Sequence, residues 1–124
     1  MLEKIQYSKE ALEWAEKNLI GKSVFRDDIK KHILFTRQGV KHAVNSGSNN
    51  VKSKFIYDAF EKLKSSVLID IQNDNKNRRQ IKKVYVFFNE WTLGGESFFV
   101  RMYAREGENG TIYYDHSFVK KKKP

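Results

Sequence analysis

Apolar residues recur at helical spacing in two segments of the first half of the chain. The first segment follows Ser8, a candidate N-cap, and ends at Gly21; its apolar positions are Ala11, Leu12, Ala15 and Leu19. The second segment follows Ser53, also a candidate N-cap, and places on one stripe Phe55, Ile56, Ala59, Phe60 and Leu63. Because residues three and four apart share one face of a helix, both segments are predicted helices that bury this face.

The residues between these two segments predict short extended pieces and a third helix. Residues 23–26 are a candidate strand, and the Asp-Asp pair that follows favours a turn. Residues 32–36 form an apolar and β-branched run, which predicts a second strand. Thr36 stands at the N-cap position of a short predicted helix over Arg37–Asn45.

The second half of the chain predicts an antiparallel sheet. Three segments are rich in Val, Phe and Tyr: residues 83–91, 97–105 and 111–119. Gly94-Gly95 and residues 106–110 have lengths typical of hairpin connections. Residues 70–80 are polar and are expected to form an exposed loop.

This order of elements predicts an α+β fold. We expect two to three N-terminal helices packed on one face of a three- to four-stranded antiparallel meander sheet. A single domain is predicted over residues 1–119, followed by a basic, disordered tail over residues 120–124.

Alternation in the middle strand assigns the two faces of this sheet. One side is uniformly apolar and predicts the core face: Phe98, Val100, Met102 and Ala104. The other side mixes aromatic rings with guanidinium groups: Phe99, Arg101, Tyr103 and Arg105. In the last strand, the same alternation puts Asp115 and Ser117 on the polar face and turns His116 toward the core. The polar face could bind an unpaired nucleotide by stacking and phosphate neutralisation, and an ordinary solvent-exposed face is the alternative.

Composition and charge narrow the class of protein. The chain has 124 residues, which suits one domain, and it contains no cysteine, which excludes disulfides and thiolate-bound metals. No stretch approaches the ~20 apolar residues of a membrane span, and we expect a soluble, cytoplasmic protein without a membrane partner. The net charge is +9, and residues 21–65 hold ten basic against four acidic residues. A polyanionic partner is therefore expected.

Histidine is the first side chain to consider for proton transfer near neutral pH, and the chain has three, namely His32, His42 and His116. His42 lies on the predicted short helix, whose start offers backbone amides to an anion and which also carries Arg37 and Lys41. His116 lies among hydroxyls and a carboxylate in the last strand. A structural or merely exposed histidine is the alternative for both.

Recognised motifs for other chemistry are missing from the sequence. It contains no metal-ligand motif, no phosphate-binding glycine loop and no Gly-x-Ser-x-Gly turn, so we expect no cofactor and no metal. The chemistry that remains uses His, Lys, Arg, Tyr and Ser. Metal-independent RNA cleavage is its main example, because RNA supplies its own 2′-hydroxyl nucleophile.

Three segments also carry a family resemblance: residues 33–43 with Gly-Val-Lys-His, residues 97–103, and residues 113–118 with Tyr-Tyr-Asp-His. They resemble the nuclease-like domains of the Barnase–EndoU–colicin–RelE (BECR) superfamily found in phage and polyvalent mobile-element proteins. The resemblance implies helices on a four-stranded antiparallel sheet with an RNA site on the open face. It makes His42 a catalytic candidate and places opposite it Arg101, Tyr113 and either Ser117 or His116.

The predicted function is a phage- or mobile-element-associated nuclease-like domain, such as a toxin, that cleaves RNA by 2′-hydroxyl transesterification. In this prediction His42 is the general base, and the phosphorane charge is stabilised by Arg101 and Lys41. The leaving oxygen is assisted by Tyr113, Ser117 or His116. Predicted substrate-binding residues are Arg37, Lys41, Phe99 and Tyr103. The alternative is a non-catalytic nucleic-acid- or protein-binding module on the same fold. The expected partners are RNA or another nucleic acid, and a cognate inhibitor protein.

Overall fold

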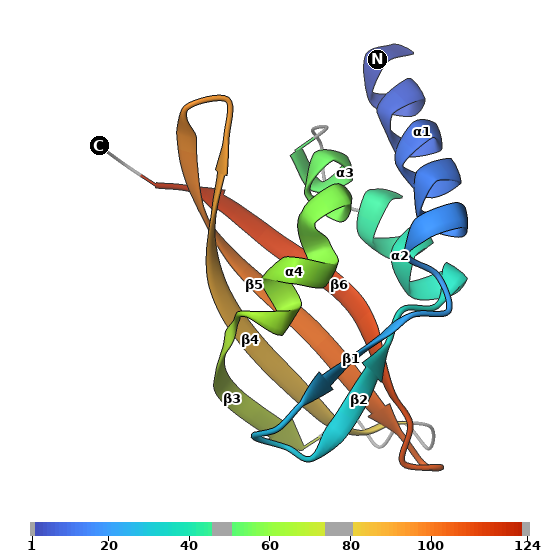
Figure 1. The fold of residues 1–124 in the computed structure, drawn as a ribbon, viewed down its shortest axis with the longest axis vertical. Coiled ribbons are helices and arrows are strands. Elements are labelled where there is room, and N and C mark those ends of the chain that lie inside the picture. The colour runs from blue at the N-terminus through green and yellow to red at the C-terminus, as the bar shows by residue number, and fades with distance from the viewer. Residues whose placement is uncertain (1, 46–50, 74–80, 123–124) are drawn as a thin grey trace.

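A computed structural model describes residues 2–45, 51–73 and 81–122 of the chain. Its helices are α1 (Leu2–Asn18), α2 (Arg37–Asn45), α3 (Val51–Phe55), the 3₁₀ helix η1 (Ile56–Asp58) and α4 (Ala59–Lys64). Its strands are β1 (Ser23–Arg26), β2 (Lys31–Leu34), β3 (Val67–Asn73), β4 (Ile81–Leu93), β5 (Glu96–Gly107) and β6 (Ile112–Lys121). The strands form one curled sheet, and the helices gather on one side of it (Figure 1).

The sheet has six strands in the order β1-β2-β6-β5-β4-β3. β2 joins β6 in parallel through Ile33 opposite Ile112 and Leu34 opposite Tyr113, whereas the other neighbours are antiparallel. The predicted three- to four-stranded antiparallel meander is therefore wrong, because the sheet is mixed and larger. β1 and β2 have only four residues each, and β2 pairs with a strand far along the chain. β3 was missed because its second half, from Asp70 to Asn73, is largely polar.

Part of the predicted polar loop belongs to this sheet. Residues 70–73 lie in β3, where they pair with β4, while residues 74–80 of the predicted loop lie outside the described residues. At the other end of the chain, the predicted basic tail over residues 120–124 overlaps β6, and its residues 123–124 lie outside the described residues. Lys120 and Lys121 belong to β6, and the backbone amide of Lys122 donates to the Ser97 carbonyl at 2.9 Å. Strand pairing therefore orders polar and basic residues whose side chains face solvent.

Two of the three predicted helix caps are internal residues with another role. Ser8 lies inside α1 and Ser53 inside α3, so neither is an N-cap. The Ser8 hydroxyl donates to the Val44 carbonyl at 3.2 Å and lies 3.1 Å from the Ser53 hydroxyl. These hydroxyls therefore join α1, α2 and α3 where the helices meet. Within the described residues, none of the helices combines the length and the apolarity that a membrane crossing requires.

The third cap and the two faces of β5 are confirmed. The Thr36 hydroxyl accepts a hydrogen bond from the Gly39 amide at 3.1 Å, at the start of α2. On β5, Val100 and Met102 are fully buried against the helices, whereas Phe99 and Arg101 are exposed on the opposite face. This opposite face of β5 and β6 is called the outer face below.

A buried arginine holds the edge of the sheet to α4. Arg26 of β1 is only 7% exposed, and its guanidinium donates to the carbonyls of Leu63 and Ser66 at 3.0 and 2.7 Å. It also pairs with Asp28 at 2.6 Å and lies over the Phe87 ring, 4.7 Å from its centroid. Arg26 therefore adds buried donors to carbonyls at and just after the end of α4 and ties this end of the helix to β1.

Candidate active site

A β-bulge in β6 turns two consecutive polar side chains toward the outer face. Tyr103 pairs with His116, but the next pair along β5 is Ala104 with Tyr114, so Asp115 is an extra residue in β6. A bulge of one residue reverses the alternation beyond it. The predicted orientation is therefore right for Asp115 and wrong from His116 onward. His116 lies on the outer face beside Tyr103.

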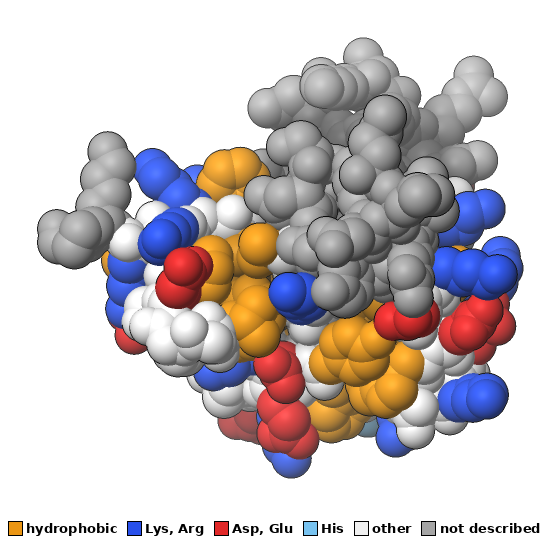
Figure 2. All heavy atoms as spheres, turned by 90° about the horizontal axis from the view of Figure 1, so that it is seen from above, with side chains coloured by type: hydrophobic (Ala, Val, Ile, Leu, Met, Phe, Trp, Pro, Cys, Tyr) orange, Lys and Arg blue, Asp and Glu red, His pale blue; other side chains and the backbone are white. Residues whose placement is uncertain are grey.

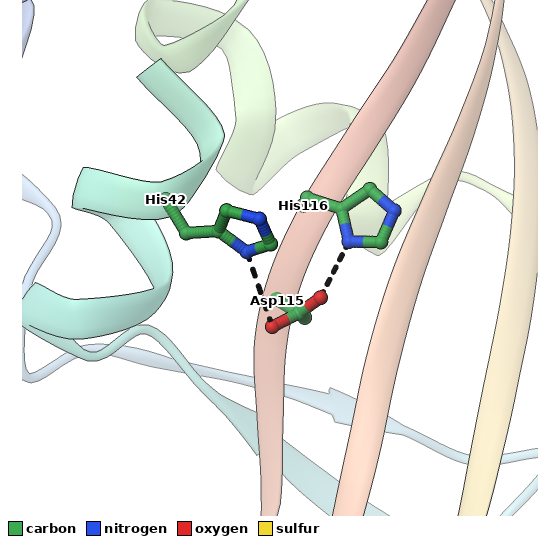
Figure 3. A group of neighbouring side chains, drawn as sticks. All are labelled: His42, Asp115 and His116. Atoms are coloured by element: carbon green, nitrogen blue, oxygen red, sulfur yellow. Dashed lines mark hydrogen bonds and ion pairs between the residues drawn. The ribbon is translucent and has the colours of Figure 1, made fainter. Parts of the chain in front are cut away.

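The bulge places the Asp115 carboxylate between two imidazole rings, as Figure 3 shows. His42 points from α2 toward the carboxylate, with its Nδ1 3.5 Å from Oδ1. His116 is hydrogen bonded through its Nδ1 to Oδ2 on the other side. The two ring centroids are 5.4 Å apart, and the His116 ring stacks on Tyr103 at 4.6 Å with an angle of 11° between the planes.

Close packing of α2 on β6 sets the position of His42. A Cβ at Gly39 would lie 2.1 Å from the carbonyl oxygen of Tyr114, so the helix backbone rests directly on the strand backbone at the bulge. His42 follows Gly39 by three residues and so lies on the same side of α2. The glycine thus allows the approach that brings the imidazole of His42 to Asp115.

Arg105 of β5 completes this group and governs the charge of the carboxylate. Its Nε lies 3.0 Å from the Oδ2 atom of Asp115. Burial raises the pKa of Asp115, but hydrogen bonds from His116 and Arg105 and the charge of Arg105 outweigh this effect. The pKa of Asp115 therefore lies well below its ordinary value, and the carboxylate is ionised at neutral pH. A fixed negative charge beside two imidazoles orients both rings.

A cleft of about 710 Å³ opens beside this group, between α2 and the connection from β5 to β6. It is lined by Thr36, Gln38, Gly39, His42, Arg105, Gly107, Glu108, Asn109, Tyr113, Tyr114 and Asp115. The side chain of His42 is 54% exposed and that of Asp115 is 20% exposed. An imidazole, a carboxylate, a guanidinium and the phenol of Tyr113 are therefore available to a ligand in one cleft.

The structure brings together some of the predicted site residues and separates others. His42, His116 and Tyr103 surround Asp115, and Tyr113 lines the adjacent cleft. Ser117 is buried on the helix side, where its hydroxyl is hydrogen bonded to that of Tyr114. Arg37 pairs with Glu16 of α1 at 3.0 Å, and Lys41 is exposed on α2.

Phe99 and Arg101 lie in a second groove, farther along the outer face. This groove has a volume of about 660 Å³ and is lined by Ile69, Phe88, Phe99, Arg101, Phe118, Val119 and Lys120. Arg101 pairs with Phe118, two positions along β5 from the pair of Tyr103 with His116. Since side chains two residues apart on a strand share a face, the groove continues the surface that carries the histidines.

Positive charge is spread over the surface and is partly neutralised. Figure 2 shows basic side chains on two opposite sides of one end of the molecule, with acidic side chains and hydrophobic patches between them. Several lysines pair with carboxylates, among them Lys31 with Glu106 at 2.8 Å and Lys122 with Glu90 at 2.8 Å. The basic side chains in this view therefore do not form one continuous surface.

Two functional candidates escaped the sequence analysis, namely Asp115 as the centre of the cluster and Arg105 as its partner. The available signals were the Asp-His pair itself and an arginine on the neighbouring strand, but neither shows which face each side chain takes. The structure also gathers His42, Asp115 and His116 with one potential metal-ligand atom each, all within 4.8 Å of one another. Ligands from α2 and β6 form no sequence motif, so the absence of a motif did not exclude this arrangement.

Comparison with known proteins identifies the family. The model of the family described as large polyvalent protein-associated domain 3 matches residues 3–114, a span that includes His42 and Arg105 and ends just before Asp115. No curated protein and no solved structure matches the chain. The match agrees with the polyvalent mobile-element setting that the resemblance implied, and it does not extend to the BECR nuclease superfamily. The chain belongs to the large polyvalent protein-associated domain 3 family.

Proposed function

We propose that this polyvalent-protein domain cleaves single-stranded RNA without a metal ion, using His42 and His116 for proton transfer. The observation that carries the proposal is the pair of imidazoles, 5.4 Å apart between centroids, on either side of the ionised Asp115. Phosphodiester cleavage by a 2′-hydroxyl needs one group to take a proton and another to give one. Two histidines held by one carboxylate suit these two tasks.

The reaction assigns a separate task to each ring. His42, exposed at the cleft, takes the proton of the ribose 2′-hydroxyl, and the 2′-oxygen forms a bond to phosphorus. The bond from phosphorus to the 5′-oxygen breaks, and His116 in its protonated form gives its proton to that oxygen. The products are a 2′,3′-cyclic phosphate end and a 5′-hydroxyl end.

Neighbouring residues support this chemistry by orientation and charge. Asp115 holds both rings through their Nδ1 atoms, and stacking on Tyr103 fixes the plane of His116. The guanidinium of Arg105 lines the cleft, so part of its charge faces a bound phosphate. Preorganised positive charge of this kind stabilises a phosphorane-like transition state.

The test is cleavage of a labelled single-stranded RNA by the purified chain in excess EDTA. We expect products with 2′,3′-cyclic phosphate ends and no cleavage of the DNA of the same sequence, which lacks the nucleophile. His42→Ala and His116→Ala should each lower the rate by about 10²- to 10⁴-fold. His32→Ala is the matched control, because His32 lies on β2 outside the cluster and is exposed. Intact RNA, or a His42→Ala rate equal to that of the parent, would exclude the proposal.

A second candidate function, binding of unpaired nucleic acid without cleavage, is favoured by the second groove. Phe88 and Phe99 contact each other there with ring centroids 5.7 Å apart, and the groove also contains Arg101. Aromatic faces beside a guanidinium suit base stacking and phosphate contact. This function predicts RNA binding that weakens steeply with salt in a chain that leaves the RNA intact, and a loss of affinity in Phe99→Ala. Binding that is insensitive to both changes would contradict it.

A further inference from the structure

We propose that His42, Asp115 and His116 bind one Zn²⁺ ion and that this ion inhibits the RNA cleavage described above. The binding site stands on the geometry of the three side chains alone. The inhibitory effect rests on the proposed function, because it requires the two histidines to transfer protons.

The three side chains lie close enough to share one ion after a small movement. Their ligand atoms all lie within 4.8 Å of one another. Zinc binds imidazole nitrogen and carboxylate oxygen at about 2.0–2.2 Å, so two tetrahedral ligands lie about 3.4 Å apart. The longest separation must therefore shorten by roughly 1.4 Å. His42 has room for this rotation because more than half of its side chain is exposed.

The donor set favours zinc over the common hard cations. Two imidazoles and one carboxylate suit zinc and related transition metals, whereas Mg²⁺ and Ca²⁺ prefer oxygen ligands. Three protein ligands also leave one coordination position for water or a phosphate oxygen. The site lies beside the cleft, which gives an ion in solution a path to it.

One feature opposes zinc binding, namely the positive charge of Arg105, which repels a cation. Its contact is with Oδ2 of Asp115, whereas Oδ1 faces His42. Oδ1 can therefore bind the ion while Arg105 keeps its hydrogen bond to the other oxygen and orients the carboxylate, as outer-shell partners of metal ligands do. His116 exchanges its hydrogen bond to Asp115 for a bond to the ion.

Zinc in this position removes the groups that the proposed reaction needs. Both rings face Asp115 with Nδ1, so the ion binds Nδ1 and the proton of each neutral imidazole then stays on Nε2. His42 is left without a lone pair to accept the proton of the 2′-hydroxyl. The ion also excludes the protonated form of His116 that supplies the proton for the leaving oxygen. Cleavage should therefore stop when the site is filled and resume when the ion is removed.

Zinc binding is tested first, on the full chain, by calorimetric titration and by competition with a chromogenic chelator. We expect one ion per chain in the parent and in His32→Ala, because His32 lies outside the cluster. His42→Ala should bind at least about 100-fold more weakly, since loss of even an outer-shell partner costs ~10- to 100-fold. Asp115→Asn should also weaken binding. Absence of stoichiometric binding, or equal binding by the parent and His42→Ala, would overturn the site.

The effect on cleavage is measured separately with the same RNA substrate. One equivalent of Zn²⁺ should inhibit the parent, and an excess of EDTA should restore the rate. If the parent cleaves no RNA under any condition, the proposed function fails while the zinc titration still decides the site. Cleavage that requires Zn²⁺, or that is unaffected by it when the site is filled, would refute the inhibitory role.

Discussion

Gly39→Ala should destabilise the protein, although the same change in most helices is stabilising. An added Cβ would lie 2.1 Å from the Tyr114 carbonyl oxygen and 3.2 Å from the Thr36 hydroxyl. Carbon and oxygen are normally at least about 3.3 Å apart, so α2 and β6 must separate by more than about 1 Å. The nearer of these two atoms, the Tyr114 carbonyl oxygen, belongs to the backbone and cannot rotate away as the end of a side chain could.

Two opposing magnitudes decide the sign of this effect. Alanine gains up to about 1 kcal/mol over glycine from helix propensity alone. Overpacking of a closely packed contact costs about 1–3 kcal/mol, and the backbone position of Tyr114 places Gly39 at the upper end of that range. We therefore expect a net loss of about 2 kcal/mol in the free energy of unfolding.

Urea denaturation of the parent, Gly39→Ala and Gln38→Ala measures this difference. Gln38→Ala is the matched control on α2, because its side chain is exposed and its change should stay within about 0.5 kcal/mol. Separation of α2 from β6 should also move His42 away from Asp115 and so weaken cleavage and zinc binding. A Gly39→Ala variant as stable as the parent would show that α2 does not rest on the bulge.

Three further predictions concern charge, a buried arginine and the two faces of β5. Burial raises the pKa of Glu106, but hydrogen bonds from Lys31 and Tyr85 outweigh this and leave the pKa below its ordinary value. The ionised form therefore stabilises the fold at neutral pH, and this stability is lost as the pH falls from the ordinary glutamate pKa of 4.5 through the lowered pKa of the folded chain. Glu106→Gln should show a shallower acid dependence in thermal melts. Arg26→Met removes the buried guanidinium that donates to the Leu63 and Ser66 carbonyls and should cost about 2–4 kcal/mol in urea denaturation, and a loss under 1 kcal/mol would contradict this role. Val100→Ala should cost about 1–3 kcal/mol by opening a core cavity, whereas Arg101→Ala should change stability by less than about 0.5 kcal/mol and weaken RNA binding. If melting temperatures show Arg101→Ala to be the more damaging change, the assignment of the two faces fails.

The sequence by itself determined the features that depend on near neighbours in the chain. Alternation over residues 97–105 identified the buried and exposed faces of β5, because successive side chains of a regular strand point to opposite faces of the sheet. Thr36 marked the start of α2, because a cap requires only a hydroxyl next to the first free amides of a helix. His42 and His116 stood out by chemical type alone.

Only the tertiary structure decided where these histidines lie relative to each other. The parallel pairing of β2 with β6 joins segments far apart in the chain, and four-residue strands carry too little pattern to predict such a partner. The bulge at Asp115 inserts one residue into the pairing of β5 with β6, and it alone turns His116 to the outer face and Ser117 to the core. These features, and the close packing of α2 on β6 at Gly39, depend on contacts between segments that are far apart in the chain. Strand register and backbone packing of this kind do not change the local order of apolar and polar residues, so the sequence pattern does not predict them.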